Sequence, residues 1–210
     1  MGKPARARLL RAFIFNPNQH FTLSQIAKRS GVSSDNASKE IAMFESWDLI
    51  KKSKMIIPQP AEIETDKKKK TTKSKKKKPA KPTQENIWTL NDDFQHLRSL
   101  VSFVREISPM EYDEIVASLQ RSGKIATIIL SGAFMGDLTR PADLIIAADV
   151  LNERKLESAI HALEPAFGHE IRYAAFTTPE FRYRLSVHDR LIRDTLDYPH
   201  LVLLDKVRLL

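Results

Sequence analysis

The chain has 210 residues and no Cys, so its composition excludes disulfide bonds and Cys-based zinc sites. Its six His show no close metal-ligand spacing, and no apolar run is long enough to span a bilayer. A hydrophobic content of 42% and a charged content of 29% are ordinary for a soluble globular protein, and the length allows two small domains. No signal-peptide pattern is present, so we expect a cytoplasmic protein. From the residue pattern we also expect no cofactor, no metal site and no membrane partner.

The positive charge of the chain is concentrated in one segment. The formal net charge is +8, and residues 67–82 contain ten Lys and no Asp or Glu. Taking these ten charges away leaves −2 for the rest of the chain. The basic character therefore belongs to a local feature and not to the whole surface.

The first ninety residues alternate short helical patterns with turn signals. Helices are predicted over residues 8–15, from an N-cap at Thr22 to about residue 30, and from Ser33 or Ser34 to about residue 47. Strands are predicted over residues 51–57 and 86–90, with residues 55–57 and 87–90 as the two arms of a hairpin. Residues 58–84 between them are low in complexity and too polar to offset their ordering entropy, so we expect a disordered loop at the hairpin tip.

The segment from Thr22 to Trp47 has the pattern of a helix-turn-helix. Ala27 is small where two helices would cross, and Gly31 follows where the turn requires a positive φ that Gly adopts at little cost. The next helix opens with short polar residues, which are the kind that reach base edges in the major groove. With the hairpin as its wing, residues 1–93 are predicted to be a winged helix-turn-helix domain that binds double-stranded DNA. A three-helix bundle that packs in the same way and binds no nucleic acid is the alternative.

Candidate DNA contacts lie on the helix-turn-helix, at the base of the wing and in the lysine tract. They are Thr22, Ser33, Ser34, Asn36, Ser38, Lys39, Lys51, Lys52, Lys54, Lys75, Lys76, Lys77 and Lys78. The predicted recognition helix has Lys39 as its only cation, so its affinity for phosphates must come largely from the tract, with help from Arg6, Arg8 and Arg11. A solvated insertion without a function, or a nuclear-localisation signal, are the other interpretations of the tract.

Two helices, over residues 94–107 and 109–123, are predicted to connect this domain to a second one at residues 124–210. The first carries an apolar stripe that fits either dimerisation or packing against the second domain. Strands and helices then alternate, with strands at 125–130, 143–148, 170–177 and 201–204 and helices at 153–167, 179–185 and 189–196. This alternation indicates a small α/β domain, and the whole chain is predicted to be α+β.

The start of the second domain carries a pattern that resembles a known fold. Residues 128–134 run from a buried strand into a turn at Gly132, and Asp137 and residues 143–146 follow. This resembles the minimal nucleotidyltransferase fold, whose signature is a Gly-Ser turn after one strand and an Asp-x-Asp pair at the start of the next. In active members the turn holds the nucleotide phosphates and the paired carboxylates hold Mg²⁺.

The sequence departs from that signature at the positions that catalysis requires. Ala133 replaces the Ser, Pro141 stands in place of the first carboxylate, and Arg172 stands where a third carboxylate is expected. One carboxylate does not organise two metal ions, so the resemblance implies an inactive domain with no catalytic residue. We expect Asp143 to cap neighbouring amides. The residues of the vestigial nucleotide site are Gly132, Asp137 and Asp143.

The order of the two domains resembles regulators in which an ArsR/MarR-like winged helix precedes a degenerate nucleotidyltransferase-like domain. Residues 173–185 and 189–196 also look like that family's pattern after the third strand. The resemblance implies a DNA-binding transcriptional regulator that is not an enzyme, whose second domain would sense a nucleotide or protein effector. Because one such module buries too little surface for tight specific binding, we expect it to act as a homodimer. An active nucleotidyltransferase that modifies a protein or RNA, with the winged helix as a docking module, is the rival hypothesis. A scaffold for protein or RNA binding is the third.

Overall fold

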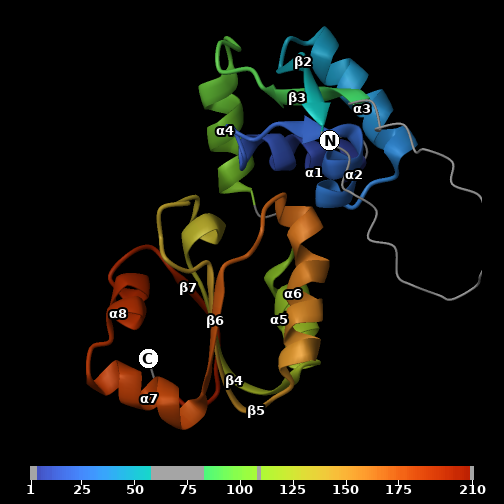
Figure 1. Cartoon of the computed structure of the whole chain (residues 1–210). Coiled ribbons are helices and arrows are strands. Elements are labelled where there is room, and N and C mark those ends of the chain that lie inside the picture. The colour runs from blue at the N-terminus through green and yellow to red at the C-terminus, as the bar shows by residue number, and fades with distance from the viewer. Residues whose placement is uncertain (1–3, 58–82, 108–109, 209–210) are drawn as a thin grey trace, which may run out of the picture.

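The structure is a computed structural model that describes residues 4–57, 83–107 and 110–208 (Figure 1). The protein is of the mixed α+β class, as the sequence predicts, with one sheet in each half of the chain. The predicted disordered loop, including Lys75, Lys76, Lys77 and Lys78, lies outside the described residues except at its end, where residues 83 and 84 begin a strand. Across the described ranges, no helix is both long enough and apolar enough to cross a membrane.

The N-terminal half contains four helices and three strands within the described residues. They are α1 (Pro4–Ile14), β1 (Phe21–Thr22), α2 (Leu23–Ser30), α3 (Ser34–Ser46), β2 (Ile50–Ile57), β3 (Thr83–Leu90) and α4 (Leu97–Glu106). Thr22 and Gln25 form a capping box at the start of α2, and Gly31 ends that helix in the left-handed conformation, with φ +60°. Ser33 caps α3. These caps fix the two helix boundaries where the sequence predicts them.

The three strands form an antiparallel sheet in the order β1–β3–β2. The predicted hairpin exists, with residues 55–57 in one arm and residues 87–90 in the other. Met55 pairs with Glu85, and Lys52 pairs with Trp88. The ladder continues through polar residues 83–86, whose composition gives no strand signal, because backbone hydrogen bonds to β2 hold them there.

The core of this half is built by α1, α2, α3 and the sheet. Phe13 packs edge-on against Phe21 and Phe44, with ring centroids 5.7 Å and 6.5 Å away. α1 begins four residues earlier than predicted, because Pro4 suits the first turn of a helix. On α4, Val104 is buried with Ile14 and Phe15, so this helix packs on the N-terminal half.

The C-terminal half is a four-stranded sheet in the order β6–β5–β4–β7, covered by helices on both faces (Figure 1). Its elements are α5 (Tyr112–Gln120), β4 (Gly123–Leu130), the 3₁₀ helix η1 (Gly132–Met135), β5 (Leu144–Leu151), α6 (Glu153–Phe167), β6 (Tyr173–Thr177), α7 (Thr178–Ser186), α8 (Arg190–Leu196) and β7 (Leu201–Asp205). β5 runs antiparallel to β4 and parallel to β6, and β7 runs antiparallel to β4.

The two faces of this sheet have separate cores. α5 and α6 cover one face, and Phe181 of α7 and Ile192 of α8 are buried on the other. Ile115 and Leu119 of α5 are fully buried in the first core. Of the two helices predicted to connect the halves, α5 is an integral layer of the C-terminal half, whereas α4 packs on α1 and also contacts η1.

The end of α6 packs directly against α1 and α2. Gly168, at φ +80°, lies so close to α1 that an added Cβ would be 2.6 Å from the backbone nitrogen of Ala12. Nδ2 of Asn16 donates hydrogen bonds to the carbonyl oxygens of Ala12, at 2.7 Å, and Gly168, at 2.8 Å. His169 stacks on Phe15 with ring centroids 5.1 Å apart. The two halves therefore share a close-packed interface, which the sequence did not indicate.

Candidate nucleic-acid interface and vestigial nucleotide site

The N-terminal part of α3 presents an exposed polar face. Ala37, Glu40, Ile41 and Phe44 are buried on one side of the helix, and Ser38 and Lys39 between them are exposed, as the helical period requires. The exposed polar residues at the start of this helix are Ser33, Ser34, Asp35, Asn36, Ser38 and Lys39. The structure therefore brings five of the predicted contacts together on one surface: Ser33, Ser34, Asn36, Ser38 and Lys39.

Thr22 does not belong to that surface. Its side chain is buried, its hydroxyl oxygen accepts a hydrogen bond from the backbone nitrogen of Gln25 at 3.3 Å, and it also contacts the hydroxyl of Ser24 at 3.0 Å. The hydroxyl is therefore occupied by the capping box of α2. The prediction that Thr22 contacts DNA is corrected, whereas the prediction that it caps α2 is confirmed.

The negative charge of α3 is smaller than its sequence indicates. Glu40 is buried, and one of its carboxylate oxygens accepts a hydrogen bond from Nε of Arg6 at 2.7 Å. The carboxylate of Glu45 accepts a hydrogen bond from the indole of Trp88. Asp35 and Lys39 therefore remain as the exposed opposite charges at the start of the helix. Because these partners are distant in sequence, the pattern of residues in α3 does not reveal that its two Glu side chains are bonded.

The other predicted cations differ in how available they are. Lys51, Lys52 and Lys54 are all exposed on β2. Lys51 forms an ion pair with Asp93 at 2.6 Å, and this hydrogen bond raises the pKa of Lys51 and lowers that of Asp93. Arg11 is buried and donates a hydrogen bond to the carbonyl oxygen of Ile107, and burial lowers its pKa. Arg11 is therefore removed from the expected phosphate contacts.

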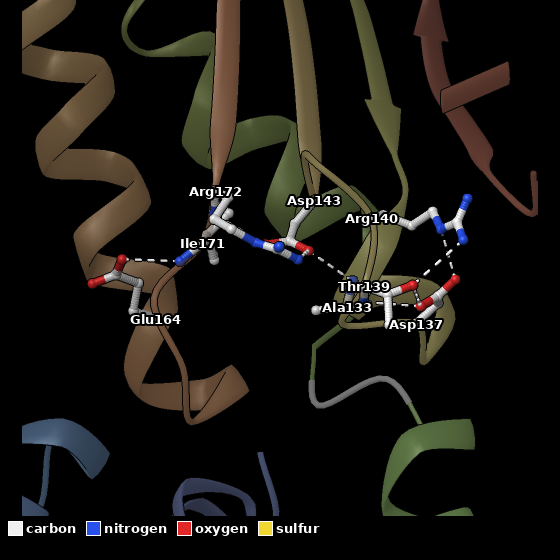
Figure 2. A network of polar contacts seen from close by, with 8 residues as sticks. All are labelled: Ala133, Asp137, Thr139, Arg140, Asp143, Glu164, Ile171 and Arg172. Carbon is white, nitrogen blue, oxygen red and sulfur yellow. Dashed lines mark hydrogen bonds and ion pairs between the residues drawn. The ribbon is translucent and has the colours of Figure 1, made fainter. Parts of the chain in front are cut away.

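At the predicted vestigial nucleotide site, Asp143 forms an ion pair with Arg172 (Figure 2). Asp143 is fully buried, and its Oδ1 accepts hydrogen bonds from the backbone nitrogen of Ala133 and from Nη2 of Arg172, both at 2.8 Å. Its Oδ2 accepts from the backbone nitrogen and Nε of Arg172, both at 3.0 Å. The hydrogen bond to Asp143 raises the pKa of Arg172. Asp143 thus caps neighbouring amides, as expected.

Gly132 and Asp137 take structural positions around this pair. Gly132 has φ +51°, and an added Cβ would lie 2.3 Å from Oδ1 of Asp143. Asp137 accepts hydrogen bonds from the hydroxyl of Thr139, at 2.6 Å, and from Nε of Arg140, at 2.7 Å. Figure 2 shows Asp137 with these partners, apart from Asp143 and Arg172. The structure does not bring the two carboxylates together as a pair.

No arrangement suited to a catalytic metal appears at this edge of the sheet. Within the described ranges, no group of three or more His, Asp or Glu side chains lies in a position to hold a metal ion. The carboxylate of Asp143, which the sequence matches to the second carboxylate of the signature, is paired with the cation of Arg172.

Comparisons with protein-family models, with curated proteins and with solved structures give no match to this chain. The resemblance to winged-helix regulators and to nucleotidyltransferases therefore remains a prediction from its residues.

Proposed function

We propose that this protein is a DNA-binding transcriptional regulator whose C-terminal half is an inactive, nucleotidyltransferase-like domain. The observation that carries the proposal is the arrangement of α1, β1, α2, α3 and the β2–β3 hairpin around one core. This is the order of elements of a winged helix-turn-helix. The helix that would enter the major groove, α3, has an exposed polar face at its N-terminal end.

Short polar side chains on α3 suit direct reading of base edges. An Asn amide both donates to and accepts from adenine, and Ser accepts or donates according to its partner. Asn36 and Ser38 are exposed, three and five residues after the Ser33 cap. Because Arg6 neutralises Glu40, phosphates that approach α3 meet less negative charge than the sequence suggests.

The closed vestigial site supports a role without catalysis. A metal ion at Asp143 would have to displace Arg172 from both carboxylate oxygens, and would leave a cation beside it. We propose that the Asp143–Arg172 pair has become a structural link between β5 and the loop before β6. The rival enzyme hypothesis requires nucleotide transfer from a nucleoside triphosphate with Mg²⁺, and we expect none above background.

The proposed homodimer has a candidate surface in the N-terminal half. An apolar groove of about 420 Å³ runs between α1, the end of α3 and α4, and Leu10 and Leu100 lie in it. Trp47 and Phe103 border the groove, and each is 48% exposed. In a two-fold dimer, Phe103 of each copy can fill the groove of the other, which would cover both exposed aromatics. A dimer also supplies the contact area that one small module lacks.

Selection of bound sequences from a random pool of duplex DNA tests the proposal. We expect enrichment of a short motif, repeated with two-fold symmetry if the protein binds as a dimer. Replacing Asn36 with Ala should reduce discrimination between the enriched motif and random duplex by about 1–3 kcal/mol. Ser158→Ala, on the exposed side of α6, is the matched control and should leave discrimination unchanged. Equal recovery of all sequences by the unaltered protein would contradict the proposal.

A further inference from the structure

A polar cleft of about 540 Å³ lies between α2 of the N-terminal half and α6 of the C-terminal half. This volume is in the range of sites for small molecules. Gln25, Lys28 and Arg29 line it from α2, and His161 and Glu164 line it from α6. Neither the exposed residues at the start of α3 nor Asp143 and Arg172 line this cleft.

The acidic groups of the cleft already have partners within the protein. Oε1 of Glu164 accepts a hydrogen bond from the backbone nitrogen of Ile171 at 3.1 Å, and Oε2 lies 2.9 Å from Nδ1 of His161. Oε1 of Glu170 accepts a hydrogen bond from Nη2 of Arg29 at 3.1 Å. Both oxygens of Glu164 therefore have a partner, and Glu170 is paired with Arg29 through one of its oxygens.

The hydrogen-bonding capacity that remains is mainly that of donors. Lys28 is exposed and forms no ion pair with any of the described residues. Oε1 of Gln25 accepts a hydrogen bond from the backbone nitrogen of Thr22 at 2.9 Å, so its NH₂ group is the part left for a ligand. The contact with Glu164 raises the pKa of His161, which favours its cationic form. A positively charged set of donors calls for an acceptor-rich anion.

We propose that this cleft binds a small multivalent oxyanion, held by Lys28, the amide of Gln25 and His161. Polycarboxylates and phosphorylated metabolites share this chemistry. A ligand held from both sides would fasten α2 to α6 and stabilise the interface between the halves.

The cleft is connected to the proposed DNA-binding surface through the turn between α2 and α3. An added Cβ on Gly31, in the turn between α2 and α3, would lie 2.9 Å from Cβ of Pro165 in α6. The turn that orients α3 therefore rests on the helix that lines the cleft. The ligand would act as the effector of the regulator, a role that rests on the proposed function. By linkage, bound DNA would change the affinity of the protein for this ligand by the same factor by which the bound ligand changes its affinity for DNA.

Calorimetric titration of the full chain without DNA tests the site, with citrate and pyrophosphate as separate probes at constant ionic strength. We expect one of them to bind saturably at one site per chain. The probe that binds distinguishes a polycarboxylate site from a phosphate site. Lys28→Gln should weaken that binding about tenfold, since it removes one charge-assisted hydrogen bond. His161→Gln should weaken it as well. Both side chains are exposed, so neither change threatens folding.

Lys155→Gln is the matched control, because Lys155 is an exposed lysine on α6 outside the cleft. Binding of neither probe, or the same loss in Lys28→Gln and Lys155→Gln, would overturn the site. Weaker DNA binding by Lys28→Gln in the absence of any probe would also overturn it, since Lys28 would then belong to the DNA interface. A chain that binds a probe but no DNA would refute the proposed function alone, and one that binds DNA but no probe would refute the site alone.

Discussion

At the scale of single residues, Asp143 shows how a position that resembles a catalytic one serves the structure. The carboxylate is fully buried and accepts four hydrogen bonds, from Ala133 and Arg172. A buried carboxylate requires such partners, because burial of an unpaired charge is costly. Its side chain is therefore tied to the protein on every side that a metal ion would use.

Asp143→Ala is expected to destabilise the protein by about 3 kcal/mol, because it leaves the Arg172 guanidinium and two backbone N–H groups without their acceptor. Urea unfolding followed by circular dichroism measures this loss. Asp137→Ala is the control, since that carboxylate is partly exposed, and it should cost less than about 1 kcal/mol. Similar losses in the two variants would contradict the structural role of Asp143.

His169 makes stability depend on pH. The side chain is buried against Phe15, and neither ring nitrogen has a hydrogen-bond partner within the described structure. Burial lowers its pKa from the ordinary value of 6.5, with the charges of Asp143, Arg172, Arg29 and Glu164 as smaller influences. The unfolded chain therefore binds a proton more readily than the folded one. The contribution of neutral His169 to the free energy of unfolding is therefore fully present above pH 6.5 and is lost as the pH falls below that value.

His169→Phe should keep the stacking on Phe15 and remove the acid-induced loss of stability that comes from His169. Unfolding free energies measured between pH 5 and 7 should then vary less with pH than in the unaltered protein. His161→Gln is the control, because the pKa of His161 is raised by Glu164 and its contribution has the opposite sign. That variant should retain the acid-induced loss. An unchanged pH profile in His169→Phe would rule out this source of pH dependence.

At the scale of elements, the contact between α6 and α1 depends on the glycine that ends α6. Gly168 and Gly136 have nearly the same positive φ, +80° and +79°. An added Cβ on Gly168 would lie 2.6 Å from the backbone of α1, at both Arg11 and Ala12. An added Cβ on Gly136 would lie 3.7 Å from its nearest neighbour in space, Cβ of Arg105. The pair thus separates backbone strain from the cost of pushing two helices apart.

Gly136→Ala should cost about 1–2 kcal/mol, which is the price of a left-handed conformation for an L residue. Gly168→Ala should cost more, by at least about 1 kcal/mol, because α1 and α6 must also move apart. Chemical denaturation of the two variants gives the difference. Equal losses would show that α6 is free to shift away from α1.

At the scale of the whole molecule, the exposed polar face of α3 and the excess of positive charge belong to different segments of the chain. The described surface of α3 carries few charges, and the ten Lys lie in residues 67–82, outside the described residues. Contacts to phosphates position a protein on DNA, whereas contacts to base edges specify its sequence. The proposed function therefore assigns specificity to α3 and most of the affinity to the tract.

Replacing the ten Lys of residues 67–82 with Ser should weaken binding to all duplex sequences and flatten the dependence of log K on log salt concentration. The loop keeps its length, so the β2–β3 hairpin has no reason to change. Fluorescence anisotropy at several salt concentrations measures the slope. Asn36→Ala serves as the comparison, since it should lower discrimination and leave the slope in place. An unchanged slope in the Ser variant would mean that the tract takes no part in binding.

Much of the fold was predictable from local patterns. The helix at residues 153–167 and the boundaries of α2 and α3 agree with the prediction, because apolar periodicity, caps and Gly31 act within a few residues. The role of α5 was not predictable in this way. Its apolar residues predict a helix, but only the folded chain shows that α5 packs on β4 and α6 and that Ile115 and Leu119 are buried there.

The sequence by itself determined the α+β class, the order of the elements and the short polar start of α3. Only the tertiary structure decided which of the candidate polar groups are available to a ligand. Thr22 is buried in the cap of α2, Glu40 is paired with Arg6, and Asp143 is paired with Arg172. The tertiary structure also placed α6 against the turn between α2 and α3, which creates the cleft. The physical reason is range, since periodicity and capping act between near neighbours, whereas burial and ion pairing join residues that only the complete fold brings together.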